Sequence, residues 1–342
     1  MKAIRLVEVG KPLQLQEIPL PVIGDRDILV RVHAAGICHS DAHYRSGLSP
    51  VRSLPITLGH EIAGVVEKKG SMVDSLIIGS RVCLHYNLTC GNCYYCSTGN
   101  EQFCPHCLML GHHIDGGYAE YVGVPARNAI SLPEEIPFDQ GATLMCASAT
   151  SFHALHKSRL RAGETVAVFG VGGLGISAVQ LARALGALEV FAVDLNEEKL
   201  QTASLYGAIP VNARTLDPVS EIRRLTKNKG VDVALELIGL PRTMRQAVQS
   251  LAPLGRIVIA GLSNKPLEID TYRELLGNEA EIIGSNDHLL HELPLVVDLA
   301  RRKILDTSRV VTRSIPLQAE AINKALDELE RFGSGLRTVI SI

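Results

Sequence analysis

The chain has 342 residues, more than a single hydrophobic core usually supports, so its length predicts two domains. Hydrophobic residues make up 46% and charged residues 20% of it, the balance of an ordinary globular protein. A formal net charge of −2 gives no reason to expect nucleic acid or an anionic membrane as a partner. No apolar stretch approaches the length of a membrane span, and the N-terminus has no secretory apolar core, so we expect a cytoplasmic protein.

Residues 1 to about 145 have the pattern of a β-rich domain. Short apolar runs alternate with Gly, Pro and Asp, the residues that favour turns. Strands are therefore predicted at residues 28–32, 62–66 and 118–122.

From about residue 160 to 285 the pattern alternates between strand and helix. Apolar runs rich in Val are followed by segments with apolar residues at helical spacing. Such alternation predicts parallel strands with crossover helices, and hence a doubly wound α/β sheet. The predicted elements are strands at 164–169, 188–193, 231–235 and 256–260, and helices from 174 to 185 and from 197 to 206. The tail is compatible with either half, with a helix predicted at 318–332 and a strand at 338–342.

Four of the eight cysteines lie within 15 residues, at the spacing C-x2-C-x2-C-x7-C. Thiolates at this spacing can converge on one tetrahedral zinc ion, and a shell of four sulfurs is a closed, structural site. The alternatives are two disulfides or four unrelated thiols, which a reducing cytoplasm and such tight clustering disfavour. The predicted ligands of this structural zinc are Cys90, Cys93, Cys96 and Cys104.

A glycine-rich turn at residues 170–175 has the pattern G-x-G-x-x-G between a predicted strand and a predicted helix. In that context Gly170 permits a tight turn, Gly172 lets the backbone approach a pyrophosphate, and Gly175 lets the helix pack on the strand. Asp194 ends the next predicted strand, where its carboxylate can bind ribose hydroxyls and would repel a 2′-phosphate. The pattern predicts NAD as the cofactor; the alternative is a plain glycine-rich turn with a surface Asp.

Three further residues, Cys38, His60 and Cys146, form a candidate for a second metal site. Two thiolates and one imidazole leave a fourth zinc position open, which is the arrangement of a catalytic zinc. Their spacing alone is weak evidence, because isolated cysteines are often core residues and an isolated histidine is often a hydrogen-bonded polar residue.

The motifs together resemble those of the zinc-dependent alcohol dehydrogenases of the medium-chain dehydrogenase family. They are residues 38–43 (CHSDAH), 59–61 (GHE), the four-cysteine segment, the glycine-rich turn, the segment 236–239 and the terminal segment 335–339. The resemblance implies an α/β protein that joins a GroES-like β-barrel catalytic domain to a Rossmann coenzyme domain. It places the catalytic domain at 1–148 with a zinc lobe at about 85–110, the NAD-binding domain at 149–287, and a C-terminal return at 288–342.

The resemblance also assigns roles at the second metal site. Cys38, His60 and Cys146 bind the catalytic zinc, and Glu61 is an alternative ligand. Ser40 and His43 form a proton relay, in which the hydroxyl contacts the reacting oxygen and the imidazole takes the proton to solvent. The alternative for this pair is a role in capping the short helix that follows Cys38.

The remaining implied residues contact the cofactor. His39 and Arg337 are expected near the pyrophosphate, Lys199 near the adenosine ribose and Thr150 beside the nicotinamide. For Arg337 and Lys199 the alternative is an ordinary solvated charge. The other positions expected at the cofactor are Gly170, Gly172, Gly173, Leu174, Gly175, Ile238, Gly261 and Leu262.

The function expected is reversible hydride transfer between a small alcohol and NAD, giving an aldehyde or ketone, with two zinc ions per chain, one catalytic and one structural. An alternative is a polyol or amino-alcohol dehydrogenase of the same family, of the sorbitol, butanediol or threonine type. Those relatives commonly have a carboxylate in place of Cys146, which argues against them. A zinc-stabilised NAD-binding protein without turnover is a further alternative. By resemblance the protein is a homo-oligomer, with a tetramer favoured over a dimer, and His85 lies near the substrate pocket.

Overall fold

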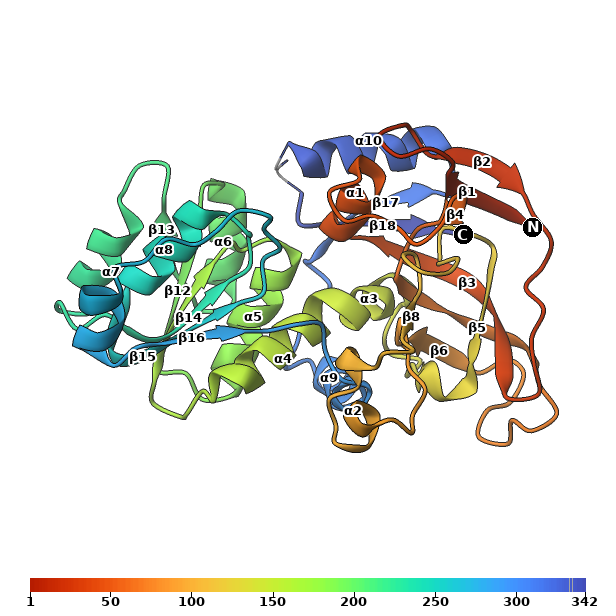
Figure 1. The fold of residues 1–342 in the computed structure, drawn as a ribbon, viewed down its shortest axis with the longest axis horizontal. Helices are drawn as coiled ribbons and strands as arrows, with labels where there is room; N and C mark the ends of the chain where they lie inside the picture. Colours follow the sequence, from red (N-terminus) through yellow and green to blue (C-terminus); the bar gives the residue numbers. More distant parts are fainter. Residues whose placement is uncertain (332, 334) are drawn as a thin grey trace. The chain divides into compact units, whose positions relative to one another are not determined.

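The computed structural model describes residues 1–331, 333 and 335–342. The chain forms two compact units (Figure 1). The first comprises Met1–Cys146, Leu289–Arg302 and Thr307–Ile342, and the second comprises Ala147–His288 and Lys303–Asp306. The functional domain boundaries predicted above stay a prediction. None of the described helices has the length and hydrophobicity needed to cross a bilayer.

The first unit is built mainly of β-strands. Its seven-stranded sheet has the order β10-β6-β5-β3-β18-β17, and β9 also pairs with the long strand β3. A three-stranded sheet has the order β2-β1-β4, and β7 pairs with β8. The strands are β1 (Lys2–Leu6), β2 (Gln14–Glu17), β3 (Asp27–Ile37), β4 (Ile56–Thr57), β5 (Glu61–Lys69), β6 (Arg81–Leu84), β7 (Asn87–Leu88), β8 (Leu108–Met109), β9 (Tyr121–Pro125), β10 (Ala129–Ser131), β17 (Val311–Pro316) and β18 (Arg337–Ser341).

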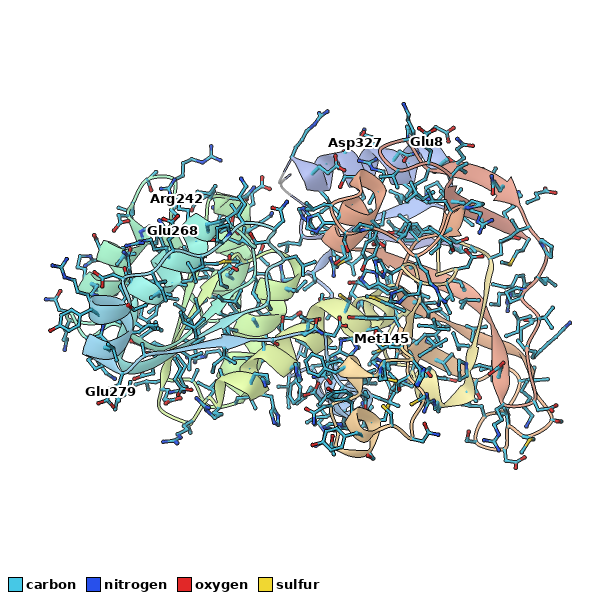
Figure 2. The ribbon with its side chains drawn as sticks, in the orientation of Figure 1. Glu8, Met145, Arg242, Glu268, Glu279 and Asp327 are labelled. Atoms are coloured by element: carbon cyan, nitrogen blue, oxygen red, sulfur yellow. The ribbon has the colours of Figure 1, made fainter. Side chains whose placement is uncertain are left out.

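The α-helices of the first unit are four to twelve residues long. They are α1 (His39–Ser46), α2 (Tyr94–Ser97), α3 (Phe138–Thr143), α9 (Leu293–Arg301) and α10 (Ala319–Glu330). Arg45 of α1 donates a hydrogen bond to Asp327 of α10 at 2.6 Å (Asp327 is labelled in Figure 2). This ion pair ties α1, which carries several predicted site residues, to the C-terminal helix. The predicted helix at 318–332 is observed as α10, and its predicted last residue, Phe332, lies outside the described residues.

The C-terminal strand joins the same sheet as the N-terminal strands. Strand β18 pairs antiparallel with β3, with Thr338 opposite Ile37 and Ser341 opposite Ala34. The predicted strand at 118–122 begins later, at Tyr121. The backbone hydrogen bonds of Tyr118 do not belong to a regular β-ladder. Its N–H donates to the Leu58 carbonyl and its carbonyl accepts from Ile4.

The second unit is a parallel sheet with helices between its strands. The sheet order is β13-β12-β11-β14-β15-β16, and every pairing is parallel. This is the doubly wound order, in which the strand sequence reverses between β11 and β14. The predicted α/β fold is thus confirmed. The elements are α4 (Ala149–Ser158), β11 (Thr165–Phe169), α5 (Gly173–Ala184), β12 (Glu189–Asp194), α6 (Glu197–Leu205), β13 (Ile209–Asn212), α7 (Pro218–Leu225), β14 (Val231–Glu236), α8 (Pro241–Gln249), β15 (Leu251–Ile259) and β16 (Glu281–Gly284).

Candidate active site

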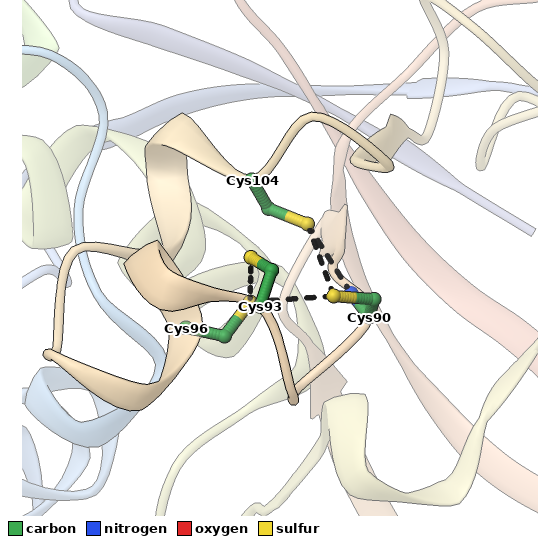
Figure 3. A group of neighbouring side chains, drawn as sticks. All are labelled: Cys90, Cys93, Cys96 and Cys104. Atoms are coloured by element: carbon green, nitrogen blue, oxygen red, sulfur yellow. Dashed lines mark hydrogen bonds between the residues drawn. The ribbon is translucent and has the colours of Figure 1, made fainter.

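The four clustered cysteines converge at one point of the first unit (Figure 3). The Cys90–Cys96 sulfurs are 3.9 Å apart, the Cys93–Cys96 sulfurs 3.5 Å and the Cys90–Cys104 sulfurs 3.6 Å. Sulfurs about 2.3 Å from a tetrahedral zinc ion lie roughly 3.8 Å from one another. These four thiols therefore fit a zinc ion, and all eight cysteines of the chain are free of disulfides.

The local backbone favours the thiolate form of Cys90, which is the form that binds a metal. The backbone N–H of Asn92 lowers the pKa of Cys90 to about 6, because it stabilises the thiolate. The backbone N–H of Cys90 in turn donates to Cys104 Sγ at 3.4 Å. Thiolates are the form that binds zinc, so the turn of the chain itself supports this shell.

A second group of possible metal ligands is wholly buried in the first unit. It consists of Cys38, His60, Glu61 and Cys146, and one ligand atom from each lies within 4.8 Å of those of the others. The sulfurs of Cys38 and Cys146 are 3.9 Å apart, again the spacing of two ligands on one tetrahedral ion. The structure brings together the three ligands predicted from sequence and their predicted alternative, although 108 residues separate the two cysteines.

Each of these residues stands at a junction of secondary structure. Cys38 is the N-cap of α1, and His60 directly precedes β5. Cys146 lies in a π-helical turn over Leu144–Ser148, a distortion that often marks functional sites. The hydrogen bond with Cys146 holds the pKa of Cys38 well below its usual range, so Cys38 is the first of the two thiols to ionise.

Asp41 is the main residue of this centre that sequence reasoning missed. Its buried carboxylate accepts hydrogen bonds from the Cys38 N–H and the Tyr118 hydroxyl, both at 2.9 Å. It also lies 3.4 Å from Nδ1 of His60. Burial lowers the pKa of His60, but Asp41 and Cys38 outweigh that effect and raise it. A carboxylate at Nδ1 orients a histidine so that Nε2 faces a metal. The available signal was Asp41 in the first turn of a helix capped by Cys38.

Glu61 has a second buried neighbour, Arg337. The Arg337 guanidinium donates to the Glu61 carboxylate and, at 3.3 Å, to the carbonyl of Ile37. Burial raises the pKa of Glu61, and the contact with Arg337 opposes that rise. Arg337 is only 6% exposed, so it is no ordinary solvated charge; its predicted contact with the pyrophosphate stays a prediction. For Glu61 to bind a metal, its carboxylate would have to share or leave this ion pair.

The residues of the predicted proton relay lie on α1, next to the metal ligands. Ser40 Oγ is 3.7 Å from Cys38 Sγ. The rings of His39 and His43 meet edge to face, with centroids 4.9 Å apart. Burial and the nearby His39 lower the pKa of His43, so its imidazole is neutral at pH 7 and can accept a proton. One aromatic ring packed against His60 is that of Tyr86, the neighbour of His85, at a centroid distance of 5.0 Å.

The second unit carries the predicted dinucleotide loop at the end of β11. Gly170 has φ +92°, which favours glycine, and a Cβ on Gly175 would lie 2.0 Å from the Gly170 carbonyl oxygen. A Cβ on Gly172 would meet nothing within 4 Å, so this backbone faces open space where a phosphate fits. Gly173 begins α5, whose free N–H groups suit an anion. Asp194, at the end of β12, accepts the Val171 N–H at 2.9 Å and stands beside this loop.

Two further predicted cofactor positions, Ile238 and Gly261, follow β14 and β15. A Cβ on Gly170 would lie 2.5 Å from the Ile238 side chain, and a Cβ on Gly261 would lie 2.2 Å from the Gly239 nitrogen. Glu236, which the sequence reasoning passed over, is fully buried and accepts hydrogen bonds from the N–H groups of Ile238 and Gly239. The remaining predicted positions in this unit are the half-buried Leu174, Thr150 on α4 and Lys199 on α6, and the exposed Leu262.

Comparisons with known proteins agree with this geometry. The family model described as "Alcohol dehydrogenase GroES-like domain" matches residues 24–134, and the one described as "Zinc-binding dehydrogenase" matches residues 173–302. An NAD-dependent alcohol dehydrogenase of Sulfurisphaera tokodaii is 36% identical, with 99% of both chains covered. An L-threonine 3-dehydrogenase of Symbiobacterium thermophilum is 34% identical, with 98% of this chain and 95% of the relative covered. The crystal structure of an alcohol dehydrogenase from Aeropyrum pernix matches with a TM-score of 0.91 at 35% identity, covering 100% of both chains.

Proposed function

We propose that this chain, which belongs to the zinc-dependent alcohol dehydrogenases of the medium-chain family, is an NAD-dependent alcohol dehydrogenase that interconverts small alcohols with aldehydes or ketones. The observation that carries the proposal is the buried group of Cys38, His60 and Cys146. Two thiolates and one imidazole leave one position of a tetrahedral zinc ion open for substrate, unlike the closed four-sulfur shell.

The roles proposed for the chain's own residues follow from their surroundings. A zinc ion at this centre would supply a Lewis acid for the alcohol, and NAD would supply the hydride acceptor. Asp41 holds the His60 ring in place through Nδ1, and the hydroxyl of Ser40 lies beside the ligand Cys38. His43, neutral at pH 7, is the group that takes the proton released by the alcohol and passes it to solvent.

NAD is the proposed cofactor because of the acid at the end of β12. Both carboxylate oxygens of Asp194 accept backbone hydrogen bonds, from Val171 and Asn196, so the side chain is fixed beside the glycine-rich loop. A fixed negative charge there favours ribose hydroxyls and repels the 2′-phosphate of NADP.

Small alcohols are preferred to polyols or threonine as the proposed substrates, although a threonine dehydrogenase is among the relatives. The observation in favour is Cys146, whose sulfur lies 3.9 Å from that of Cys38 and completes a sulfur-rich ligand set. The polyol and amino-alcohol dehydrogenases that the sequence resembles commonly have a carboxylate at this ligand position.

A cytoplasmic homotetramer is the proposed assembly. Strand β16 forms the edge of the parallel sheet, and the apolar side chains of Tyr272, Leu276 and Ile282 are exposed on it or shortly before it. An unpaired edge with exposed apolar residues can pair with a second copy. Light scattering on the purified protein tests this, and a monomer would contradict it.

The test of the function is NADH formation with a panel of primary, secondary, aromatic and polyol alcohols, together with zinc analysis. The wild type is expected to hold two zinc ions per chain and to oxidise simple alcohols. Cys38→Ser is expected to hold one zinc and to show no detectable turnover. Cys83→Ala, a buried cysteine outside both groups, is the matched control and should keep both ions and the activity. Two zinc ions retained in an active Cys38→Ser variant would contradict the proposal.

A further inference from the structure

A cavity of about 650 Å³ opens in the first unit beside the four-cysteine lobe. Four of its eight lining residues carry cationic or imidazole side chains, and none is acidic. These four are Arg52, His106, His112 and His113. The motifs that define the family do not include any of them, and neither the zinc groups nor the dinucleotide loop uses this cavity.

The guanidinium of Arg52 is available to a ligand. Arg52 is exposed, and among the residues that the structure describes its side chain forms no hydrogen bond or ion pair. The buried or half-buried arginines of this unit, in contrast, mostly donate to a carboxylate or carbonyl. The backbone of Arg52 is nevertheless anchored, because its N–H donates to the His112 carbonyl at 3.1 Å. A guanidinium on an anchored backbone presents a fork of N–H donors that matches a carboxylate or phosphate.

The two adjacent histidines are held in defined tautomers. The Met109 backbone N–H donates to Nδ1 of His113 at 2.9 Å, so the neutral His113 ring carries its proton on Nε2. This Nε2 lies 3.2 Å from Nδ1 of His112 and donates to it, so His112 in turn carries its proton on Nε2. Arg52 and His113 line the same cavity, and burial together with the charge of Arg52 lowers the pKa of His113. The wall thus combines two imidazole rings in fixed orientations with one full positive charge.

The cavity wall is one aromatic ring away from the second metal group. The buried Tyr44 ring contacts His60 on one side, with centroids 6.4 Å apart, and His112 on the other, with centroids 4.7 Å apart. The Tyr44 hydroxyl lies 3.9 Å from the sulfur of Met109, which ends β8 just before the two histidines. A molecule that reaches the metal group and extends past Tyr44 would therefore meet this wall.

We propose that the cavity lined by Arg52, His106, His112 and His113 is a binding site for a small anion with phosphate or carboxylate oxygens, and that it holds the anionic end of an alcohol substrate. The assignment of the anion to an alcohol substrate rests on the proposed dehydrogenase function, whereas the anion site itself does not. The hollow has a volume of about 650 Å³ and no acidic residue in its lining, so no negative charge on its wall opposes an anion.

Binding of inorganic phosphate to the zinc-loaded, full-length protein at low ionic strength tests the site itself. Calorimetry on the wild type is expected to give saturable binding, and Arg52→Gln should weaken it about 10- to 100-fold, the loss typical of one charge-assisted pair. Arg52→Lys should fall between the two, because a lysine keeps the charge and loses the fork. Arg309→Gln, at an exposed arginine outside the cavity, is the matched control and should bind as the wild type does. Equal phosphate binding by the wild type and Arg52→Gln would overturn the proposal.

Kinetics identify the source of the anion. The assay compares a small alcohol that carries a carboxylate with its uncharged methyl ester. For the anionic alcohol, Arg52→Gln is expected to lower kcat/KM about 10- to 100-fold, with no change for the ester. A different outcome is that phosphate binds at Arg52 and, when added to the assay, changes the turnover of the anionic alcohol and of its ester equally. The bound anion is then an effector separate from the substrate, and the substrate assignment is overturned. Phosphate binding without any turnover would leave the site standing and refute the dehydrogenase.

Discussion

The two cysteine-containing groups of the first unit differ in sequence spacing, burial and surroundings. The four-cysteine lobe comes from 15 consecutive residues, three of its cysteines are partly exposed, and its ligand set is sulfur alone. The group of Cys38, His60 and Cys146 is assembled from distant segments, is fully buried, and has carboxylates and a guanidinium packed around it. A closed shell needs only to hold the chain together, whereas a reactive centre needs neighbours that orient ligands and move protons.

The largest effects are expected from removing one ligand in each group. His60→Ala should abolish detectable alcohol oxidation while the lobe zinc stays bound, because an open site depends on each of its three ligands. Cys96→Ser should instead release the lobe zinc and lower Tm by several degrees, since a structural zinc contributes to folding. Zinc analysis, thermal unfolding and NADH formation on both variants check this.

Cys107→Ser is the control for the lobe, because Cys107 lies three residues past the last predicted ligand and outside the group. It should keep two zinc ions and an unchanged Tm. If the folded fraction of Cys96→Ser lost turnover as completely as His60→Ala does, the distinction between a structural and a reactive group would fail.

A smaller effect is expected from Asp41, which has no counterpart in the lobe. Asp41→Asn preserves the shape of the side chain but removes the charge that orients His60. Loss of such a partner of a metal-binding histidine typically costs 10- to 100-fold in metal affinity or activity, and we expect a loss of about that size in zinc affinity. Competition with a chelator measures it, and Tyr118→Phe, which removes one hydrogen bond to the same carboxylate, should cost less. An unchanged zinc affinity in Asp41→Asn would show that His60 needs no orienting partner.

A region can be predicted from the sequence when its interacting residues lie close together along the chain, and less well when they lie far apart. The lobe and the glycine-rich turn are local patterns, so their spacing alone indicated Cys90–Cys104 and the turn at Gly170. The second metal group had no informative spacing, and only the resemblance to a family joined Cys38 to Cys146. Asp41 and Glu236 escaped notice because a carboxylate that accepts from a backbone N–H three residues away is common in surface turns as well. The rings of Tyr118 and His60 beside Asp41 come from distant segments that only the fold brings near. Burial, which no single-sequence pattern reports, is what distinguishes such carboxylates from surface ones.

In the second unit, Asp194 is expected to affect the choice of cofactor and not the chemical step. Asp194→Asn keeps a hydrogen-bond acceptor but removes the negative charge, so discrimination against the 2′-phosphate should weaken. We expect the ratio of kcat/KM for NAD to that for NADP to fall about tenfold, roughly the weight of one charged contact. Zinc content and kcat with saturating NAD should not change. A ratio equal to that of the wild type would mean that another residue selects the cofactor.

The smallest effect is expected from the pH dependence of the proposed proton acceptor. Because burial and the nearby His39 lower the pKa of His43, its imidazole stays neutral until the pH falls below the ordinary value of about 6.5. The kcat/KM of the wild type should therefore be flat around pH 7 and decline only below about pH 6.5. His43→Gln, which cannot titrate, should lower kcat/KM modestly at pH 7 and lose this decline. If the wild type and His43→Gln showed the same decline at low pH, the decline would belong to a different group. The control is His156→Gln, which changes a histidine on α4 outside the predicted site and should retain the wild-type pH profile.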